Sequence, residues 1–190
     1  MTEHRKYWTE EEVSLIFKVA EREPKPWFRA RNRAILLVMY WRGLRASEVG
    51  NLKLSHWREK SGRLYIERLK GSLTSEPLLS PAENRALKSW KRVRGAVPGP
   101  LFPSREGSKG IDRRMIFLIV QKIAAAAGLP LDLRHPHCFK HSIGTHLAGK
   151  LPLPKLQQWL GHKDPRSTLV YAQFRCLELD SAANEIYSQS

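Results

Sequence analysis

Four stretches of this sequence carry side chains that could act on a phosphate group: residues 43–48, Lys70, residues 135–142 and residues 159–171. In the first, Arg45 has a planar guanidinium that can bind two phosphate oxygens at once. In the last, Tyr171 follows His162 by nine residues, and its hydroxyl is a candidate nucleophile. Histidine and lysine side chains in the other stretches could transfer protons or bind a phosphate.

Each of these residues also has a structural explanation. Arg45 precedes Glu48 by three residues, so the two could form an ordinary ion pair on a helix. Lys70 lies at a predicted turn, where a lysine is usually a solvated charge. Tyr171 follows two apolar residues on a predicted helix, where a tyrosine usually contributes to packing. Taken singly, these residues therefore do not establish an active site.

The run from His135 to Ser142 raises a further alternative, a metal site. His135, His137, Cys138 and His141 are four candidate ligands within seven residues. Structural zinc sites typically space their ligands as two separated pairs, and no CxxC or second Cys/His pair accompanies this run. We therefore predict no metal and no other cofactor.

The elements that must position these residues are mostly helical. Thr9 and Glu12 form a capping-box pair, and the apolar residues that follow at helical spacing predict a first helix. The apolar run from Ala34 to Trp41 predicts a buried central helix, which Gly43 ends. Capping residues and apolar spacing predict further helices at residues 81–94, 116–127, 139–147, 156–160, 167–174 and 177–187.

One segment between the helices has the pattern of strands. Leu64 and Ile66 alternate with polar neighbours, Gly71 interrupts the run, and a second short apolar stretch follows at residues 78–79. This pattern predicts a small antiparallel sheet with Lys70 beside its turn. The predicted fold class is therefore mainly α with a small antiparallel β-sheet, an α+β fold.

The composition indicates a nucleic-acid partner. The chain has 33 Lys and Arg residues against 18 Asp and Glu, a net charge of +15, which attracts a polyanion. Its two cysteines cannot form a disulfide framework, and its longest apolar run is too short to span a bilayer. We therefore expect a cytoplasmic protein with no membrane partner. The basic residues that we expect to follow phosphates are Arg31, Arg33, Lys53, Arg113 and Arg114.

The order of the motifs is more specific than any one of them. Together they resemble the active site of the tyrosine recombinases, also called the phage-integrase family: Gly-Leu-Arg-Ala-Ser-Glu at 43–48, a sheet-edge lysine, His-x-x-Lys-His at 137–141, Leu-Gly-His at 160–162 and Tyr171. The resemblance runs from about Thr9 to Phe174. Within the family, short fimbrial phase-variation invertases are the most similar, since they share blocks like those at residues 44–48, 65–70 and 87–90.

This resemblance implies the fold of a tyrosine recombinase catalytic domain at residues 1–176. Residues 177–190 would form a C-terminal helix or tail that docks on a neighbouring protomer or folds back onto its own domain. The implied activity is site-specific recombination of double-stranded DNA, by a homotetramer on paired recombination sites. Two alternatives stay open: a type IB topoisomerase-like relaxase and a DNA-binding regulator with impaired catalysis.

The resemblance also implies catalytic roles. Arg45 and Lys140 would hold the scissile phosphate, and His162 would donate a hydrogen bond to it. Tyr171 would attack the phosphorus and form a 3′-phosphotyrosyl bond. This chemistry needs no metal, and the aspartates of the chain are scattered rather than clustered as two-metal enzymes require.

Four further residues would support that reaction. By the same resemblance, Lys70 would protonate the departing 5′-oxygen as the general acid, and His137 would assist proton transfer at the nucleophile. Glu48 and His141 would orient their neighbours.

The chain departs from the family at one of these positions. Most family members have arginine where this chain has Lys140, and lysine lacks the planar fork that binds two oxygens. A lysine-tolerant natural variant, a deliberate mutation and a decayed enzyme would each explain the difference. We favour natural variation, because the other five catalytic positions are intact.

Overall fold

Helix α2 is the element around which the rest of the chain packs. The computed structural model describes residues 5–69, 72–105 and 107–176. Its helices and strands, in chain order, are α1 (Glu10–Glu21), α2 (Pro26–Arg42), α3 (Ala46–Asn51), β1 (Trp57–Arg58), β2 (Arg63–Leu64), α4 (Pro81–Arg94), α5 (Arg113–Ala126), α6 (His137–Ala148), α7 (Leu153–Leu160) and α8 (Arg166–Cys176), with short 3₁₀ turns at Leu54–His56 and Leu131–Leu133. Helix α2 contacts α1, α3, α4 and α6.

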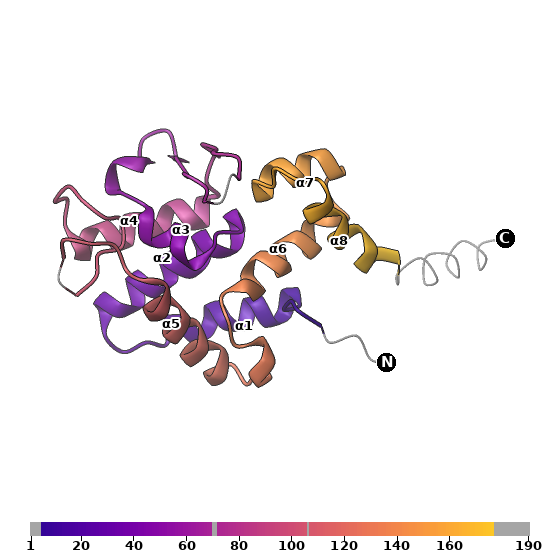
Figure 1. The fold of residues 1–190 in the computed structure, drawn as a ribbon. Coiled ribbons are helices and arrows are strands. Elements are labelled where there is room, and N and C mark those ends of the chain that lie inside the picture. Colours follow the sequence, from indigo (N-terminus) through magenta and orange to yellow (C-terminus); the bar gives the residue numbers. More distant parts are fainter. Residues whose placement is uncertain (1–4, 70–71, 106, 177–190) are drawn as a thin grey trace.

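The larger part of the molecule comprises α1 to α5 and the small sheet, and α6 leads from it to α7 and α8 (Figure 1). Helix α6 contacts α2 on one side and α7 and α8 on the other. The candidate catalytic residues that the structure describes therefore lie on α6 and on the elements to either side of it. Within the described residues, the helices are too short or too polar to cross a membrane.

The predicted central helix is confirmed. Residues 34–40 of α2 are all buried, as expected for a helix that is apolar on every face. The helix ends at Gly43, which adopts the left-handed conformation with a φ of 56° and donates its N–H to the Met39 and Tyr40 carbonyls. Glycine accepts this conformation without strain, so the chain turns sharply into the segment that carries Arg45.

Helices α1 and α4 begin where their capping boxes predicted. The side chains of Thr9 and Glu12 bond each other's backbone N–H groups, and Ser80 and Glu83 do the same. Glu83 also accepts hydrogen bonds from Arg42 at 2.9 and 2.7 Å, which ties α4 to the end of α2.

The small antiparallel sheet is present, but its strands differ from the predicted ones. Strand β2 pairs with β1, and the pairing of residues 63–66 with residues 75–78 is limited to isolated bridges. The sequence prediction missed β1 because two residues are too few to show an alternating pattern. The predicted helix at 177–187 and Lys70 lie outside the described residues.

Candidate active site

Arg45 is held at the start of α3 by Glu48. The Arg45 backbone N–H donates to Glu48 Oε2 at 2.9 Å, and its Nη1 donates to Oε1 at 2.9 Å. Glu48 is fully buried, whereas 27% of the Arg45 side chain is exposed. The expected ion pair therefore exists, and it leaves the guanidinium open to a cavity that Ser72 and His162 also line.

The Glu48 carboxylate accepts hydrogen bonds from two further groups. Arg68 Nη1 and the Leu69 backbone N–H each lie 3.2 Å from one of its oxygens. Burial raises the pKa of Glu48, but the hydrogen bond from the Arg45 backbone and the charge of Arg68 outweigh it, so the pKa lies below its ordinary value. A carboxylate that stays ionised keeps both arginines paired and in place.

Lys140 is not among the residues that line this cavity. Its Nζ donates to the Leu160 carbonyl at 3.1 Å, at the end of α7, and the residue is only 8% exposed. Burial, together with the charges of Arg45 and Arg68, lowers the pKa of Lys140 to about 7. With a pKa near neutrality, the charge of Lys140 depends on pH and on the charges around it.

His162 lines the same cavity as Arg45 and is fixed by a threonine. Gly161 ends α7 in the left-handed conformation, and His162 Nδ1 then lies 2.9 Å from Thr168 Oγ1. Burial, and next the charges of Lys140 and Arg45, lower the pKa of His162 to about 4. The ring is therefore neutral at pH 7. If Thr168 donates to Nδ1, the ring carries its proton on Nε2 and can donate it to a phosphate oxygen.

Tyr171 is buried against α6. Its ring packs on Gly144, where an added Cβ would lie 2.5 Å from the tyrosine Cζ. It stacks on His162, with ring centroids 6.3 Å apart and planes 10° apart, and its hydroxyl lies 3.4 Å from His141 Nδ1. Burial raises the pKa of Tyr171 to about 12, although the charge of Arg45 opposes this shift.

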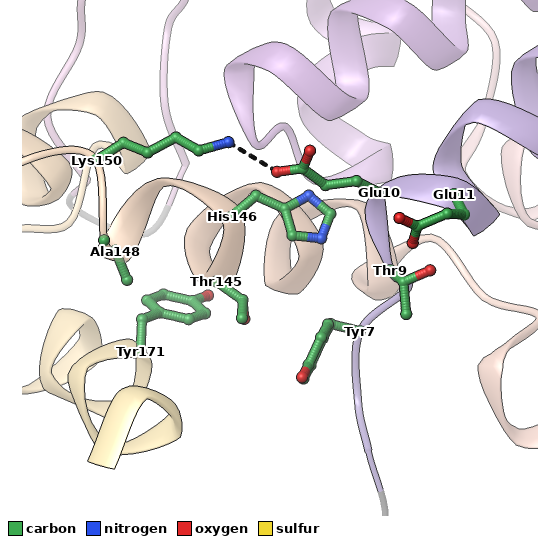
Figure 2. A pocket seen from close by; sticks show the side chains of 10 residues that line it. Tyr7, Thr9, Glu10, Glu11, Thr145, His146, Ala148, Lys150 and Tyr171 are labelled. Carbon is green, nitrogen blue, oxygen red and sulfur yellow. Dashed lines mark hydrogen bonds and ion pairs between the residues drawn. The ribbon is translucent and has the colours of Figure 1, made fainter. Parts of the chain in front are cut away.

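In this structure Tyr171 faces a different cavity from Arg45. That second cavity, of about 390 Å³, lies between α1, α6 and α8. Figure 2 shows the Tyr171 ring at its edge beside Thr145, with His146 and the Lys150–Glu10 ion pair on the far side. The nucleophile predicted from the sequence is thus next to the cavity that Arg45 lines, with His162 between the two.

The structure places His141, rather than His137, at the tyrosine hydroxyl. His141 is half-buried on α6, and burial, together with the charges of His137 and His135, lowers its pKa. His137 is exposed at the first position of α6, with its ring 6.3 Å from that of His135. The proton-transfer role that the sequence assigned to His137 therefore has no contact with Tyr171 among those that the structure gives.

The histidine-rich run does not assemble a metal site. Among the residues that the structure describes, no three His, Cys, Asp or Glu side chains are grouped so that they could hold a metal ion. Cys138 is buried, its thiol donates to the Leu133 carbonyl at 3.2 Å, and burial raises its pKa to about 12. The buried thiol is therefore protonated at neutral pH.

Two of the five predicted phosphate-binding residues already have protein partners. Arg31 is only 8% exposed, and its guanidinium stacks over the rings of Trp27 and Phe28. Arg33 forms an ion pair with Glu21 of α1 at 3.2 Å. Arg31 therefore has a structural role in packing, because too little of its side chain is exposed to contact a phosphate.

The other three lie exposed around the junction of α3 and α5. Lys53 follows α3, and Arg113 and Arg114 begin α5. A Cβ on Gly110 would overlap the Gly50 carbonyl oxygen, so only glycine allows the backbone to cross so closely there. This crossing fixes the basic start of α5 against the helix that Arg45 begins.

Three residues of the site did not emerge from the sequence. Arg68 and Ser72 contact the Arg45–Glu48 pair, and Thr168 contacts His162. The available signal for Arg68 was its position in the block at residues 65–70 that the chain shares with the invertases. Ser72 and Thr168 are common residue types in ordinary positions, and no sequence signal marked them.

Known proteins are similar to this chain in sequence and in fold. Among curated relatives, the type 1 fimbriae regulatory protein FimB of Escherichia coli (strain K12) is 35% identical over 173 residues, which cover 88% of this chain and 84% of FimB. The tyrosine recombinase XerC of Erythrobacter litoralis is 33% identical over 180 residues, which cover 92% of this chain and 57% of XerC.

Solved structures of recombinases have a similar fold. The XerA recombinase superposes with a TM-score of 0.77 at 24% identity, over 98% of this chain and 66% of XerA. The XerH site-specific recombinase bound to its difH substrate in a pre-cleavage complex gives a TM-score of 0.78 at 25% identity, over 93% of this chain and 53% of XerH. The chain thus spans only about half to two thirds of the length of these Xer proteins. The phage integrase family model matches residues 6–176, and with the FimB relationship this shows that the chain belongs to the phage integrase family, the tyrosine recombinases.

Proposed function

We propose that this chain is a site-specific DNA recombinase that cuts and rejoins strands through a 3′-phosphotyrosyl intermediate. The observation that carries the proposal is the grouping of Arg45, His162 and Tyr171. Arg45 and the neutral His162 line one cavity, and Tyr171 stacks directly on His162. A fixed cation and a hydrogen-bond donor in one cavity suit the non-bridging oxygens of a phosphodiester.

In the proposed reaction, the bond from Tyr171 Oη to phosphorus forms as the bond from phosphorus to the 5′-oxygen breaks. The tyrosine proton passes to a neighbouring base, for which His141 is placed at 3.4 Å, and the departing 5′-oxygen takes a proton from Lys70. The role of His137 at the nucleophile stays a prediction. The covalent bond conserves the energy of the broken linkage, so a 5′-hydroxyl of another strand can reverse the step without ATP.

In this scheme, Lys140 becomes positively charged when a phosphate occupies the cavity. The charge of Arg45 lowers the pKa of Lys140, and the charges of Lys140 and Arg45 lower that of His162, so the three side chains lie near one another. A phosphate in the cavity would favour the charged form of Lys140, because an opposite charge nearby raises the pKa of a lysine. Lys140 would then add a second cation to the phosphate that Arg45 binds.

The proposed partner is double-stranded DNA with specific recombination sites. The relatives named XerC are tyrosine recombinases, and the XerH structure holds a difH substrate. The exposed Lys53, Arg113 and Arg114 give the chain cations on the α3–α5 face, which would contact DNA phosphates. We further propose a homotetramer on paired sites, with residues 1–176 as the catalytic domain and residues 177–190 as its docking tail.

A covalent-adduct assay tests this proposal. Nicked duplexes of randomised sequence are incubated with the protein, and adducts that survive denaturation are selected and sequenced. We expect adducts on one family of sites from the wild-type chain and none from Tyr171→Phe. DNA binding without adducts would contradict the enzyme and favour a DNA-binding regulator. Relaxation of supercoiled DNA without recombination between paired sites would instead favour a topoisomerase.

A further inference from the structure

Arg68 joins two parts of the chain that lie far apart in the sequence, residues 42–48 and Trp159. Its Nη1 donates to the Gly43 carbonyl and to Glu48 Oε2, each at 3.2 Å. Its Nη2 donates to the Arg42 carbonyl at 2.6 Å and to the Trp159 carbonyl at 3.4 Å. One buried guanidinium therefore bonds the end of α2, the start of α3 and the last turn of α7.

The segments that Arg68 joins carry Arg45 and His162, the two residues proposed to donate hydrogen bonds to the phosphate. Glu48 holds Arg45 on one side, and Gly161 leads directly into His162 on the other. A Cβ on Gly161 would lie 2.9 Å from Arg68 Nε, so the glycine leaves the room that the guanidinium occupies. Arg68 thus lies between Arg45 and His162 without lining the cavity itself.

We propose that Arg68 is a positioning residue that sets the separation of Arg45 and His162, so that both donors meet the same phosphate. The inference rests on the proposed recombinase activity. Its physical basis is the rigid fork of arginine, which can bond several acceptors at fixed angles, whereas a lysine presents a single point of charge. Displacing a catalytic group by about 1 Å can slow a reaction on the order of 100-fold.

The main test is Arg68→Met, which keeps the length of the side chain and removes the fork. Cleavage is measured in single turnover at saturating concentrations of a nicked duplex recovered from the adduct selection. We expect cleavage to slow about 100-fold, while the affinity for that duplex changes little, because Lys53, Arg113 and Arg114 are unaltered.

Arg94→Met is the matched control. The Arg94 guanidinium also bonds several backbone carbonyls, those of Gly95, Val97 and Pro100, at the end of α4 and away from the cavity. Its loss should destabilise the fold without slowing cleavage by the folded protein. Arg68→Lys is the second variant, should Arg68→Met not fold. It keeps the charge but not the fork, and we expect it to cleave more slowly than the wild type.

A second substrate separates positioning from general damage. A methylphosphonate at the scissile position lacks the negative charge that Arg45 neutralises. On this duplex, the loss caused by Arg68→Met or Arg68→Lys should therefore shrink toward that of Arg94→Met. An equal loss on both substrates, an equal loss in Arg94→Met, or wild-type rates in the Arg68 variants would each overturn the inference alone. A wild-type chain that forms no adduct would refute the proposed function, and this inference with it.

Discussion

The α2–α3 side of the site and the α6–α8 side hold their charges differently. On the first side, Arg45 and Arg68 share the buried carboxylate of Glu48, whose pKa lies below its ordinary value. On the second side, burial and the neighbouring cations lower the pKa of Lys140 to about 7 and that of His162 to about 4. The α2–α3 side (the fixed side: Arg45, Glu48 and Arg68) is thus held together by a shared carboxylate. On the α6–α8 side (the variable side: Lys140, His162 and Tyr171), His162 is neutral at pH 7 and the charge of Lys140 can change near neutral pH.

This difference suggests how the site could distinguish free protein from DNA complex. A buried charge without a partner is costly, so the α6–α8 side gives up protons when its cavity holds no anion. A scissile phosphate would supply the missing negative charge and restore the proton on Lys140. The fixed side would therefore recognise the phosphate, while the variable side responds to it.

Replacing Glu48 by glutamine is expected to have the largest effect, because it breaks the fixed side. The change keeps the shape and removes the charge that two buried or half-buried arginines share. Breaking a buried ion pair typically costs about 3–5 kcal/mol of stability. Denaturant titration should show a loss of that size, and adduct formation by the folded fraction should fall by about 100-fold or more.

Glu83→Gln is the control for that change. Glu83 is as buried as Glu48, and it pairs with Arg42 away from the cavity. We expect a similar loss of stability and no loss of cleavage by the folded protein. Comparable cleavage in the Glu48 and Glu83 variants would mean that the fixed side does not act on the phosphate.

Lys140→Arg sharpens the comparison, because it makes the variable side permanently charged. A charged hydrogen bond contributes about 1.5–3 kcal/mol, so the second contact of an arginine should preserve cleavage or raise it, by up to roughly a hundredfold at pH 8. Single-turnover rates measure this effect, with Lys150→Arg as the control on an exposed lysine. A collapse of cleavage would show that the site is built around lysine.

Protonation of Lys140 should make the stability of the protein depend on pH. The folded Lys140 pKa of about 7 lies below the ordinary 10.5, so the unfolded chain binds more protons between these values. The free energy of unfolding should therefore gain a contribution as pH rises from 7 to 10.5, and Lys140→Met should lack it. Calorimetry of DNA binding at pH 8, in buffers of different ionisation enthalpy, should show proton uptake by the wild type and less by Lys140→Arg.

Sequence patterns predicted the features that depend on near neighbours in the chain. The capping box of Thr9 and Glu12, the stop at Gly43 and the Arg45–Glu48 pair each involve residues at most four apart or a single glycine. Their geometry follows from the helix itself, so local spacing is sufficient. The family motifs added the order of the catalytic residues.

Features that depend on distant contacts could not be predicted. Arg68 finds the Trp159 carbonyl 91 positions away, and Lys140 bonds the Leu160 carbonyl rather than an open cavity. The burial of Tyr171 depends on Gly144, whose missing side chain admits the ring. None of these pairings has a spacing rule, because tertiary packing alone sets them.

Gly144→Ala tests whether the raised pKa of Tyr171 depends on the packing of its ring against Gly144. The added Cβ would lie 2.5 Å from Tyr171 Cζ, so the ring must move. Overpacking of this kind costs about 1–3 kcal/mol, and the displaced phenol should lose part of the burial that raises its pKa to about 12. Ultraviolet titration should show a tyrosine that ionises nearer its ordinary value, with Tyr171→Phe identifying which tyrosine it is.

Thr168→Val should have the smallest effect, and it isolates one bond on the variable side. Valine nearly matches the shape of threonine but cannot bond His162 Nδ1, which now lies 2.9 Å from the buried Thr168 hydroxyl. A neutral hydrogen bond contributes about 0.5–1.5 kcal/mol, so cleavage should slow by roughly tenfold at most. Because the ring keeps its stacking on Tyr171, DNA affinity should not change. Unchanged cleavage would show that packing alone orients His162, and that the variable side owes its geometry to Tyr171 rather than to Thr168.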